Sequence, residues 1–310
     1  KGNYIMIGTE DLKKEIQHLK KEKHAVILAH YYVTDEVQEI ADYIGDSYYL
    51  AKIAKDSDAD IILFAGVSFM GESAKILNPE KTVLMPDLSA DCAMAHMADS
   101  KTIEAMREKY EDLAVVCYIN STAELKCLSD VCVTSANALK IVEALPNKNI
   151  FFIPDGNLGR YVKEKALNKN VILNDGYCPV HKAFDPEQIK ALKQEHPDAP
   201  VAAHPECTSD VLYYADYIGS TSGIIDFVSK SNAAEFIICT EQGVGYTLKK
   251  NNPDKNFYFV GEKCVCQDMK LNTLKSVYNA LNEGTNTVEI DEAKRKRALL
   301  PLERMLELAK

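Results

Sequence analysis

An apolar run that ends in polar side chains, AVILAHYY, occupies residues 25–32. Two related runs follow it along the chain, LAVVCYIN at 113–120 and PVAAHPE at 200–206. A short continuous apolar run is typical of a strand that is buried on both faces of a parallel sheet. The three runs therefore predict three such strands, each with polar residues at its carboxyl end.

The same offset leads from each run to a small hydroxyl residue. Seventeen positions separate His30 from Ser47, Tyr118 from Ser135, and His204 from Thr221. Serine and threonine commonly cap the free backbone N–H groups at the start of a helix. We therefore expect a helix to begin at each of these hydroxyl residues.

Two further strands are predicted in each repeat, and the last of them leads to cysteine. The second strands are expected at 59–65, 148–153 and 234–239, and the third strands at 81–86, 170–173 and 256–260. The cysteines that follow the third strands are Cys92, Cys178, and the pair Cys264 and Cys266, with 86 positions from Cys92 to Cys178 and 88 from Cys178 to Cys266.

Alternation of strands and helices predicts an α/β fold. We expect three similar α/β/α units with small parallel sheets, arranged around a pseudo-threefold axis, with the active site at the centre. The units are predicted at 1–98, 99–185 and 186–284, with residues 285–310 packing on the first. Ligands of open α/β sheets bind beyond the carboxyl ends of the strands, which is where the polar residues lie.

Composition narrows the classes of function. Hydrophobic residues make up 46% and charged residues 26% of the 310 residues, and the formal net charge is −10. A nucleic-acid partner is not expected, because no basic cluster stands out. A membrane partner is not expected either, since no apolar run reaches spanning length and no leader-like segment opens the sequence. We expect a soluble, cytoplasmic protein.

Nine cysteines suggest a metal or cluster site in a reducing compartment. The chain has no CxxC pair, so a zinc ribbon is not expected. Three thiolates, one from each repeat, could hold a cubane iron–sulfur cluster that leaves one iron without a protein ligand. An open iron site acts as a Lewis acid and suits the loss of water.

Histidine, tyrosine and glutamate at the strand ends could move protons around such a site. Those residues, with a neighbouring asparagine, are His30, Tyr32, Tyr118, Asn120, His204 and Glu206. Burial is expected to raise the pKa of Glu206 and make it a better base. The helix-start hydroxyls Ser47, Ser135 and Thr221 would favour anions such as carboxylates and a phosphate.

Each of these residues also has an ordinary structural interpretation. A single buried histidine is more often structural, a helix-start hydroxyl is mostly a cap, and a cysteine after a strand is more often a core residue. The functional interpretation depends on the shared register of the three repeats.

The sequence resembles the quinolinate synthase family in its three-cysteine form, over nearly the whole chain. The segments that carry the resemblance are AHYY at 29–32, GDS at 45–47, GVSFMGE at 66–72, CYIN at 117–120, GYCPVH at 176–181, HPEC at 204–207, TEQG at 240–243 and MKLNTL at 269–274.

The resemblance implies a [4Fe–4S] cluster on Cys92, Cys178 and Cys266. It implies the condensation of iminoaspartate with dihydroxyacetone phosphate to quinolinate, with loss of water and phosphate, in de novo NAD biosynthesis. An aspartate oxidase or aspartate dehydrogenase would supply the iminoaspartate. The implied substrate contacts are His30, Ser47, Tyr118, Ile119, Asn120, Ser135, His204, Pro205, Glu206 and Thr221. Tyr32 and Glu206, with His30 and His204, resemble the family's catalytic residues.

Two positions depart from the family pattern. Asp91 stands before the first cluster cysteine, where the family often has glycine, and Cys264 precedes Cys266 as an alternative ligand. Three other functions stay open at this point: another [4Fe–4S] hydro-lyase with an open iron site, a cluster carrier or iron sensor, and a cluster-free α/β binding protein.

Overall fold

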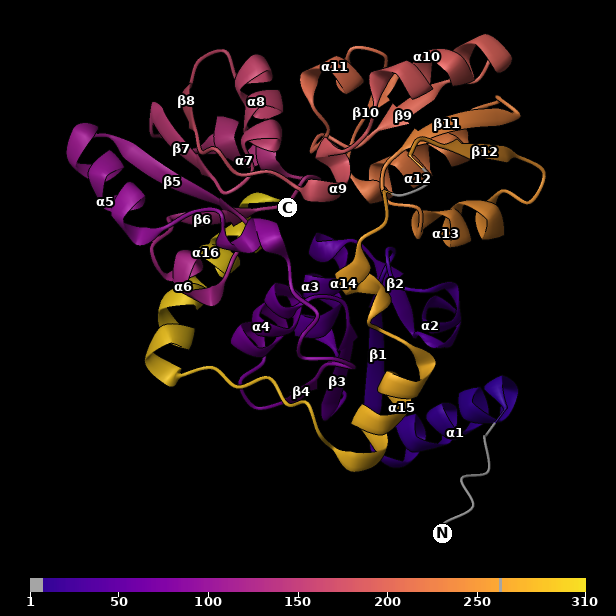
Figure 1. Cartoon of the computed structure of the whole chain (residues 1–310). Helices are drawn as coiled ribbons and strands as arrows, with labels where there is room; N and C mark the ends of the chain where they lie inside the picture. The colour runs from indigo at the N-terminus through magenta and orange to yellow at the C-terminus, as the bar shows by residue number, and fades with distance from the viewer. Residues whose placement is uncertain (1–7, 262–263) are drawn as a thin grey trace.

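The fold consists of three four-stranded parallel sheets, whose strands alternate with helices along the chain. A computed structural model describes residues 8–261 and 264–310. The sheets have the strand orders β2-β1-β3-β4, β6-β5-β7-β8 and β10-β9-β11-β12, so the first strand of every repeat takes the same internal place. The three units meet around a common centre (Figure 1), which confirms the predicted class of fold.

The elements of the first unit are α1 (Thr9–Glu22), β1 (Ala25–His30), α2 (Asp35–Ile40), β2 (Tyr43–Gly45), α3 (Ser47–Asp56), β3 (Ile61–Ala65), α4 (Ser68–Leu77), β4 (Thr82–Leu84) and the 3-10 helix η1 (Ala93–His96). Those of the second are α5 (Ser100–Lys109), β5 (Leu113–Tyr118), α6 (Ala123–Cys127), β6 (Val131–Val133), α7 (Ala138–Ala144), β7 (Asn149–Ile153), α8 (Gly156–Lys165), β8 (Asn170–Leu173) and α9 (Pro179–Lys182).

The elements of the third unit are α10 (Pro186–Glu195), β9 (Val201–Ala203), α11 (Ser209–Leu212), β10 (Tyr217–Ile218), α12 (Thr221–Lys230), β11 (Glu235–Cys239), α13 (Val244–Asn251) and β12 (Asn256–Phe259). The chain ends in α14 (Gln267–Lys270), α15 (Leu274–Glu283) and α16 (Glu292–Leu308).

The three quoted apolar runs form the strands β1, β5 and β9. In β1 every residue after Ala25 is buried, and all six residues of β5 are buried. Helices cover both faces of each sheet, which explains why these strands lack polar alternation. All their carboxyl ends point to the centre of the molecule.

One edge strand in each unit was not predicted from the sequence. β2, β6 and β10 contain only two or three residues each and pair in parallel with the first strand of their repeat. Such short segments carry too little periodicity to be recognised. They matter because each one ends just before a predicted hydroxyl residue.

Two of the three predicted helix starts are correct. Ser47 and Thr221 are the first residues of α3 and α12, whereas Ser135 lies in a turn and α7 begins only at Ala138. The caps are not the predicted hydroxyls. Asp46 accepts the N–H of Tyr49, and the Ser220 hydroxyl accepts the N–H of Gly223.

The C-terminal segment crosses between units (Figure 1). α15 packs on α1 of the first unit, and α16 packs on α6 and β6 of the second unit as well as on α4 of the first. The limits 1–98, 99–185 and 186–284 remain our proposal for the units, but by packing α15 belongs with the first. Residues 285–310, expected on the first unit, bridge the first and second through the apolar side of α16.

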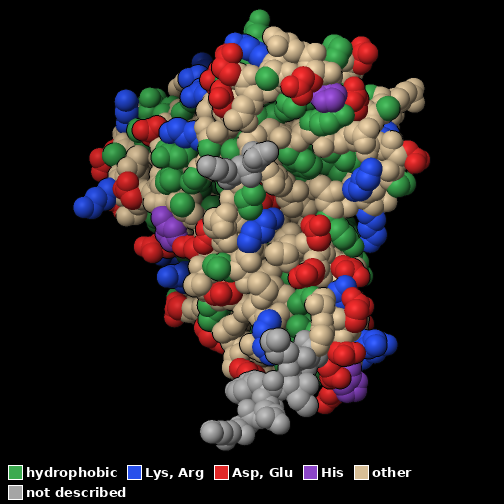
Figure 2. Space-filling model, turned by 45° about the vertical axis from the view of Figure 1, so that its right-hand side comes forward, with side chains coloured by type: hydrophobic (Ala, Val, Ile, Leu, Met, Phe, Trp, Pro, Cys, Tyr) green, Lys and Arg blue, Asp and Glu red, His purple; other side chains and the backbone are tan. Residues whose placement is uncertain are grey.

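The core reflects this bridging. The first and second units share one continuous apolar cluster with α15 and α16, whereas the third sheet has a separate cluster on each face. In the described part of the chain, no helix is both long enough and apolar enough to cross a membrane. On the face drawn in Figure 2, the basic and acidic side chains of the described residues are interspersed.

Candidate active site

A cavity of about 80 Å³ lies where the carboxyl ends of the three sheets converge. Twelve of the fourteen residues predicted for the site line it: His30, Tyr32, Ser47, Cys92, Tyr118, Asn120, Ser135, Cys178, His204, Glu206, Thr221 and Cys266. The two others, Ile119 and Pro205, are buried beside it without lining it. The repeats thus bring residues up to 236 positions apart, from His30 to Cys266, to one place.

Two histidines have the same local geometry in the first and third units. Nδ1 of His30 accepts the backbone N–H of Tyr32 at 3.1 Å, and Nδ1 of His204 accepts that of Glu206 at 3.3 Å. Burial lowers the pKa of each imidazole to about 3. Both rings are therefore neutral at pH 7, with the proton on Nε2. Nε2 of His204 lies 3.2 Å from Oγ of Ser135.

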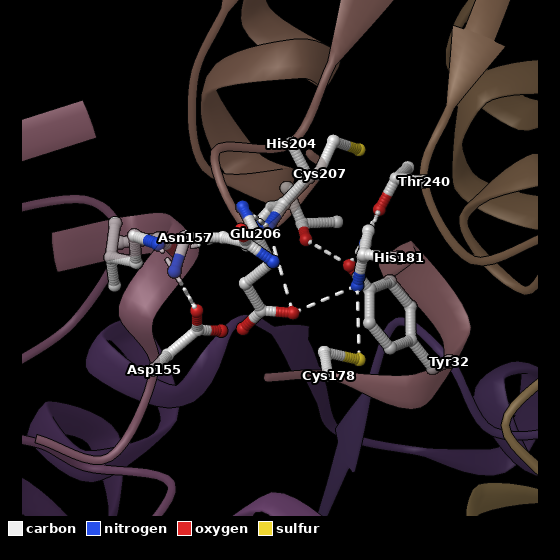
Figure 3. A network of polar contacts seen from close by, with 12 residues as sticks. Tyr32, Asp155, Asn157, Cys178, His181, His204, Glu206, Cys207 and Thr240 are labelled. Carbon is white, nitrogen blue, oxygen red and sulfur yellow. Dashed lines mark hydrogen bonds and ion pairs between the residues drawn. The ribbon is translucent and has the colours of Figure 1, made fainter. Parts of the chain in front are cut away.

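Glu206 is the centre of a buried polar network (Figure 3). The Tyr118 hydroxyl donates to Oε1 at 2.5 Å, and Nδ1 of His181 lies 2.8 Å from Oε2. Burial opposes ionisation of Glu206, but the rings of His204 and His181 and the Tyr118 phenol outweigh it and lower the pKa below the ordinary value. The expectation that burial would raise this pKa was wrong, because it ignored these partners.

The network continues from Glu206 to Tyr32. Nε2 of His181 lies 3.0 Å from Oγ1 of Thr240, and the Tyr32 hydroxyl lies 2.8 Å from Thr240 and 2.7 Å from Thr221. With Nδ1 of His181 as the donor to Glu206 and Nε2 as an acceptor, one donor assignment satisfies every group: Thr221 to Tyr32, Tyr32 to Thr240, Thr240 to His181, and His181 to Glu206. The chain of donors therefore points toward Glu206.

His181 and Thr240 were not among the predicted site residues. Their signal in the sequence was positional: His181 is three residues after Cys178, and Thr240 directly follows β11. Both lay in segments that carried the family resemblance, but neither belongs to the 17-residue register that selected the other residues.

Three cysteines share a local arrangement around the cavity. Cys92, Cys178 and Cys266 each directly precede a single helical turn, η1, α9 or α14. Burial raises the pKa of the Cys92 and Cys266 thiols to about 12 and about 11, and that of Cys178 well above its ordinary value. The backbone N–H of the third residue after each cysteine (Ala95, His181 or Met269) faces the sulfur and lowers the pKa of that thiol, which opposes the effect of burial.

This donor set fits a cationic cluster. Buried thiols become thiolates when a metal compensates their charge, and amides that face the sulfurs stabilise cluster thiolates. None of the nine cysteines forms a disulfide, so these three are free to bind iron.

A second group of possible ligands lies in the same cavity. Cys178, His181 and Glu206 place one ligand atom each within 4.8 Å of one another, an arrangement that could hold a single metal ion.

The structure separates Cys264 from Cys266. Cys266 lines the cavity, whereas Cys264 is buried in the core of the third unit, where its sulfur packs close to Gly261.

Asp91, the other position that departs from the family pattern, is fixed by hydrogen bonds to its neighbours. Its Oδ1 accepts from the Ser68 hydroxyl at 2.5 Å and from the Cys92 N–H at 2.8 Å. It therefore organises the Cys92 loop.

Two buried polar atoms beside the cavity have no partner in the described residues. They are Oδ1 of Asn120 and Oγ1 of Thr134, and both residues line the cavity. Buried polar atoms are normally hydrogen-bonded. These two are therefore available to a bound ligand.

A family model and several curated relatives match nearly the whole chain, and all of them point to the same family. The family model described as "Quinolinate synthetase A protein" matches residues 14–307. The quinolinate synthase of Fusobacterium nucleatum is 55% identical over 298 residues, which cover 96% of this chain and 99% of that protein. Those of Clostridium perfringens and Clostridioides difficile are 51% and 49% identical, over 96% and 97% of this chain and 99% of each relative.

Proposed function

Because the chain belongs to the quinolinate synthase family, we propose that it condenses iminoaspartate with dihydroxyacetone phosphate to quinolinate, releasing water and phosphate, in de novo NAD biosynthesis. The family predicted from the sequence is confirmed. The observation that carries the proposal is the single cavity in which three cysteines meet acid–base residues from all three units. The competing hypotheses of a cluster carrier or a cluster-free binding protein leave that network without a purpose.

The proposed cofactor is a [4Fe–4S] cluster on Cys92, Cys178 and Cys266. When bound, it would supply an iron without a protein ligand, a Lewis acid for a substrate hydroxyl or carboxylate. The similar placement of the three cysteines before single helical turns supports this ligand set.

Substrate anions are proposed to bind at the hydroxyl residues. Ser47 and Thr221 stand at the positive ends of the ten-residue helices α3 and α12, where free N–H groups favour carboxylate or phosphate. Because Asp46 and Ser220 provide the caps, the Ser47 and Thr221 hydroxyls are not needed for capping. The partnerless Asn120 and the Nε2–H groups of the neutral histidines supply further donors and acceptors.

Proton transfer is assigned to Glu206 and Tyr32. Ring formation requires protons to leave carbon and hydroxyl groups to leave as water. Glu206 is ionised and accepts a proton, and its low pKa makes it a ready donor to a leaving hydroxyl once protonated. The donor chain through His181 and Thr240 exchanges protons between Tyr32 and Glu206 without bulk water.

An assay of the anaerobically purified protein tests the proposal. With iminoaspartate and dihydroxyacetone phosphate it should form quinolinate, detected by chromatography, in proportion to its bound iron. Protein stripped of iron by a chelator is the control and should be inactive. Iron-loaded protein that dehydrates a simple hydroxy acid, but forms no quinolinate, would contradict the proposal. A cytoplasmic location and supply by an aspartate oxidase or dehydrogenase remain predictions from the resemblance.

A further inference from the structure

Glu241 is a fully buried carboxylate that has no part in the proposed catalysis. It follows β11, and none of its surface is exposed to solvent. Its Oε1 accepts the backbone N–H of Cys266 at 3.1 Å and lies 3.0 Å from Nζ of Lys270. Its Oε2 accepts the N–H of Gly243 at 2.6 Å. Both oxygens thus accept hydrogen bonds from the protein, and the side chain forms part of the cavity wall.

Lys270 connects this carboxylate to the first unit. It is the last residue of α14, the single turn that begins after Cys266. Its Nζ donates to the backbone carbonyl of Tyr32 at 2.6 Å in addition to its contact with Glu241. One ammonium group therefore joins the loop of a proposed cluster ligand to the backbone of a proposed proton-transfer residue.

The two segments approach closely at the same place. A Cβ atom on Gly243 would lie 2.7 Å from Cα of Tyr32 and 2.8 Å from the carbonyl oxygen of Tyr31, so only glycine fits. The buried amide of Gln38 donates to the carbonyls of Tyr31 and Gly243, both at 2.9 Å. The Glu241–Lys270 pair thus lies at a tight contact between backbones of the first and third units.

We propose that Glu241 and Lys270 are positioning residues that hold the Cys266 loop and Tyr32 in register. The inference rests on the proposed function, because it assigns Cys266 to the cluster and Tyr32 to proton transfer. A hydrogen bond to a charged partner is stronger than one between neutral groups. The pair therefore fixes the Cys266 backbone more firmly than a neutral side chain at position 241 would.

The first test measures the three thiols in iron-free, full-length protein. Alkylation of Cys92, Cys178 and Cys266 is followed separately by mass spectrometry. Lys270→Met should speed the alkylation of Cys266 by roughly tenfold, the scale of one lost charge-assisted hydrogen bond, and leave the other two nearly unchanged. Lys270→Arg should restore the slow rate, because it returns the charge and the donors.

The matched control is Lys255→Met. Like Lys270, Lys255 donates from Nζ to the backbone, at the carbonyls of Val228 (2.6 Å) and Ser231 (2.7 Å). Neither of these partners lines the cavity, whereas Tyr32 and Glu241, the partners of Lys270, do. This variant should leave all three thiol rates unchanged. Circular dichroism checks folding, and Lys270→Gln replaces the Met variant if that variant is unfolded.

A second measurement addresses Tyr32 in the iron-loaded enzyme. Lys270→Met should lower kcat by roughly tenfold with little change in KM, since it displaces a proton-transfer residue and leaves the anion sites in place. Iron release to a chelator should be faster in the same variant. An unchanged Cys266 alkylation rate, or an equal increase at all three cysteines, would overturn the inference. Thiol and iron measurements do not depend on which reaction occurs, so they separate this inference from the proposed function.

Discussion

Asp155 and Glu241 occupy equivalent places in the second and third units, and their environments differ. Each is the second residue after the corresponding strand of its unit, β7 or β11, and each is fully buried. Glu241 has Lys270 and two backbone N–H donors. Oδ1 of Asp155 caps α8 by accepting the N–H groups of Asn157 and Leu158, but its Oδ2 has no partner in the described residues.

The difference shows that a repeat sets the position of a side chain but not its charge. Burial raises the pKa of Glu241, and Lys270 opposes that shift. For Asp155, burial and then the charge of Glu206 both raise the pKa well above its ordinary value, and two backbone N–H groups and Arg160 oppose that shift only in part. In Figure 3 its free oxygen lies on the side of Glu206. The corresponding residue of the first unit, Val67, is apolar.

The largest effect is expected at the cysteine whose N–H Glu241 accepts. Cys266→Ser should remove most of the bound iron and all quinolinate formation, because a hydroxyl is a poor iron ligand. Iron analysis and the quinolinate assay measure both effects. Cys264→Ser is the matched control and should retain the iron, because Cys264 packs in the core of the third unit. The reverse result would exchange the roles of the two cysteines.

The next effect tests the charged side of the comparison. Glu241→Ala should lower the free energy of unfolding of iron-free protein by about 3 kcal/mol, because it leaves a partly buried ammonium group without its partner. Urea denaturation provides the measurement. Glu187→Ala removes the partner of Lys190 at an exposed site and should have little effect. Equal losses of unfolding free energy in the two variants would show that the Glu241–Lys270 pair contributes no more to stability than an exposed ion pair does.

The charge of Glu206, which raises the pKa of Asp155, belongs to the proposed proton-transfer pair, so changes to that pair should mainly affect turnover. Glu206→Gln and Tyr32→Phe should lower kcat by roughly a hundredfold, the usual scale of acid–base catalysis. Both variants should retain normal iron content and still bind a dicarboxylate analogue, as measured by calorimetry. Near-normal turnover by the Gln variant would exclude Glu206 from proton transfer and leave Tyr32, His30 or His204 as candidates.

The neutral side of the comparison predicts a dependence on pH. Asp155 has a raised pKa in the folded protein, so its contribution to stability is complete below the ordinary aspartate pKa and is lost as pH rises toward the folded value. Above pH 4, the stability of the wild type relative to Asp155→Asn should therefore fall by up to about 1.4 kcal/mol per pH unit. Urea denaturation between pH 4 and pH 7 measures this slope.

Asparagine is the informative replacement, because it keeps an N-cap acceptor while remaining uncharged. Asp185→Asn changes an exposed N-cap of the same kind and controls for the cap itself. A flat difference between wild type and Asp155→Asn would mean that Asp155 is ionised like Glu241, and the comparison would fail.

The smallest effects are expected at the hydroxyls. Ser47→Ala and Ser135→Ala should each raise the KM for an anionic substrate by roughly tenfold, the scale of one hydrogen bond to a charged group. Iron content should not change. Ser276→Ala alters a capping hydroxyl of α15 outside the cavity and serves as the control. Unchanged kinetics at both cavity positions would reduce these hydroxyls to structural roles.

Local chain geometry explains why so much of the site was predictable. Residues that follow a buried parallel strand must emerge at the carboxyl edge of its sheet, so His30, Tyr118 and His204 could be placed from three apolar runs. The cysteines followed from the same repeat. The family resemblance then distinguished Cys266 from Cys264, and the structure places only Cys266 in the cavity wall.

The amino-acid sequence by itself determined the threefold repeat, its strand ends and twelve of the residues that line the cavity, because these depend on patterns within a few tens of residues. Tertiary structure alone decided which groups touch and which are charged. Tyr32 meets Thr221 and Glu206 meets Tyr118 across separate units, and Lys270 joins Glu241 to the backbone of Tyr32 in the first unit. A pKa depends on the burial and partners of a group in space, so the low pKa of Glu206 and the contrast between Asp155 and Glu241 emerged only after folding.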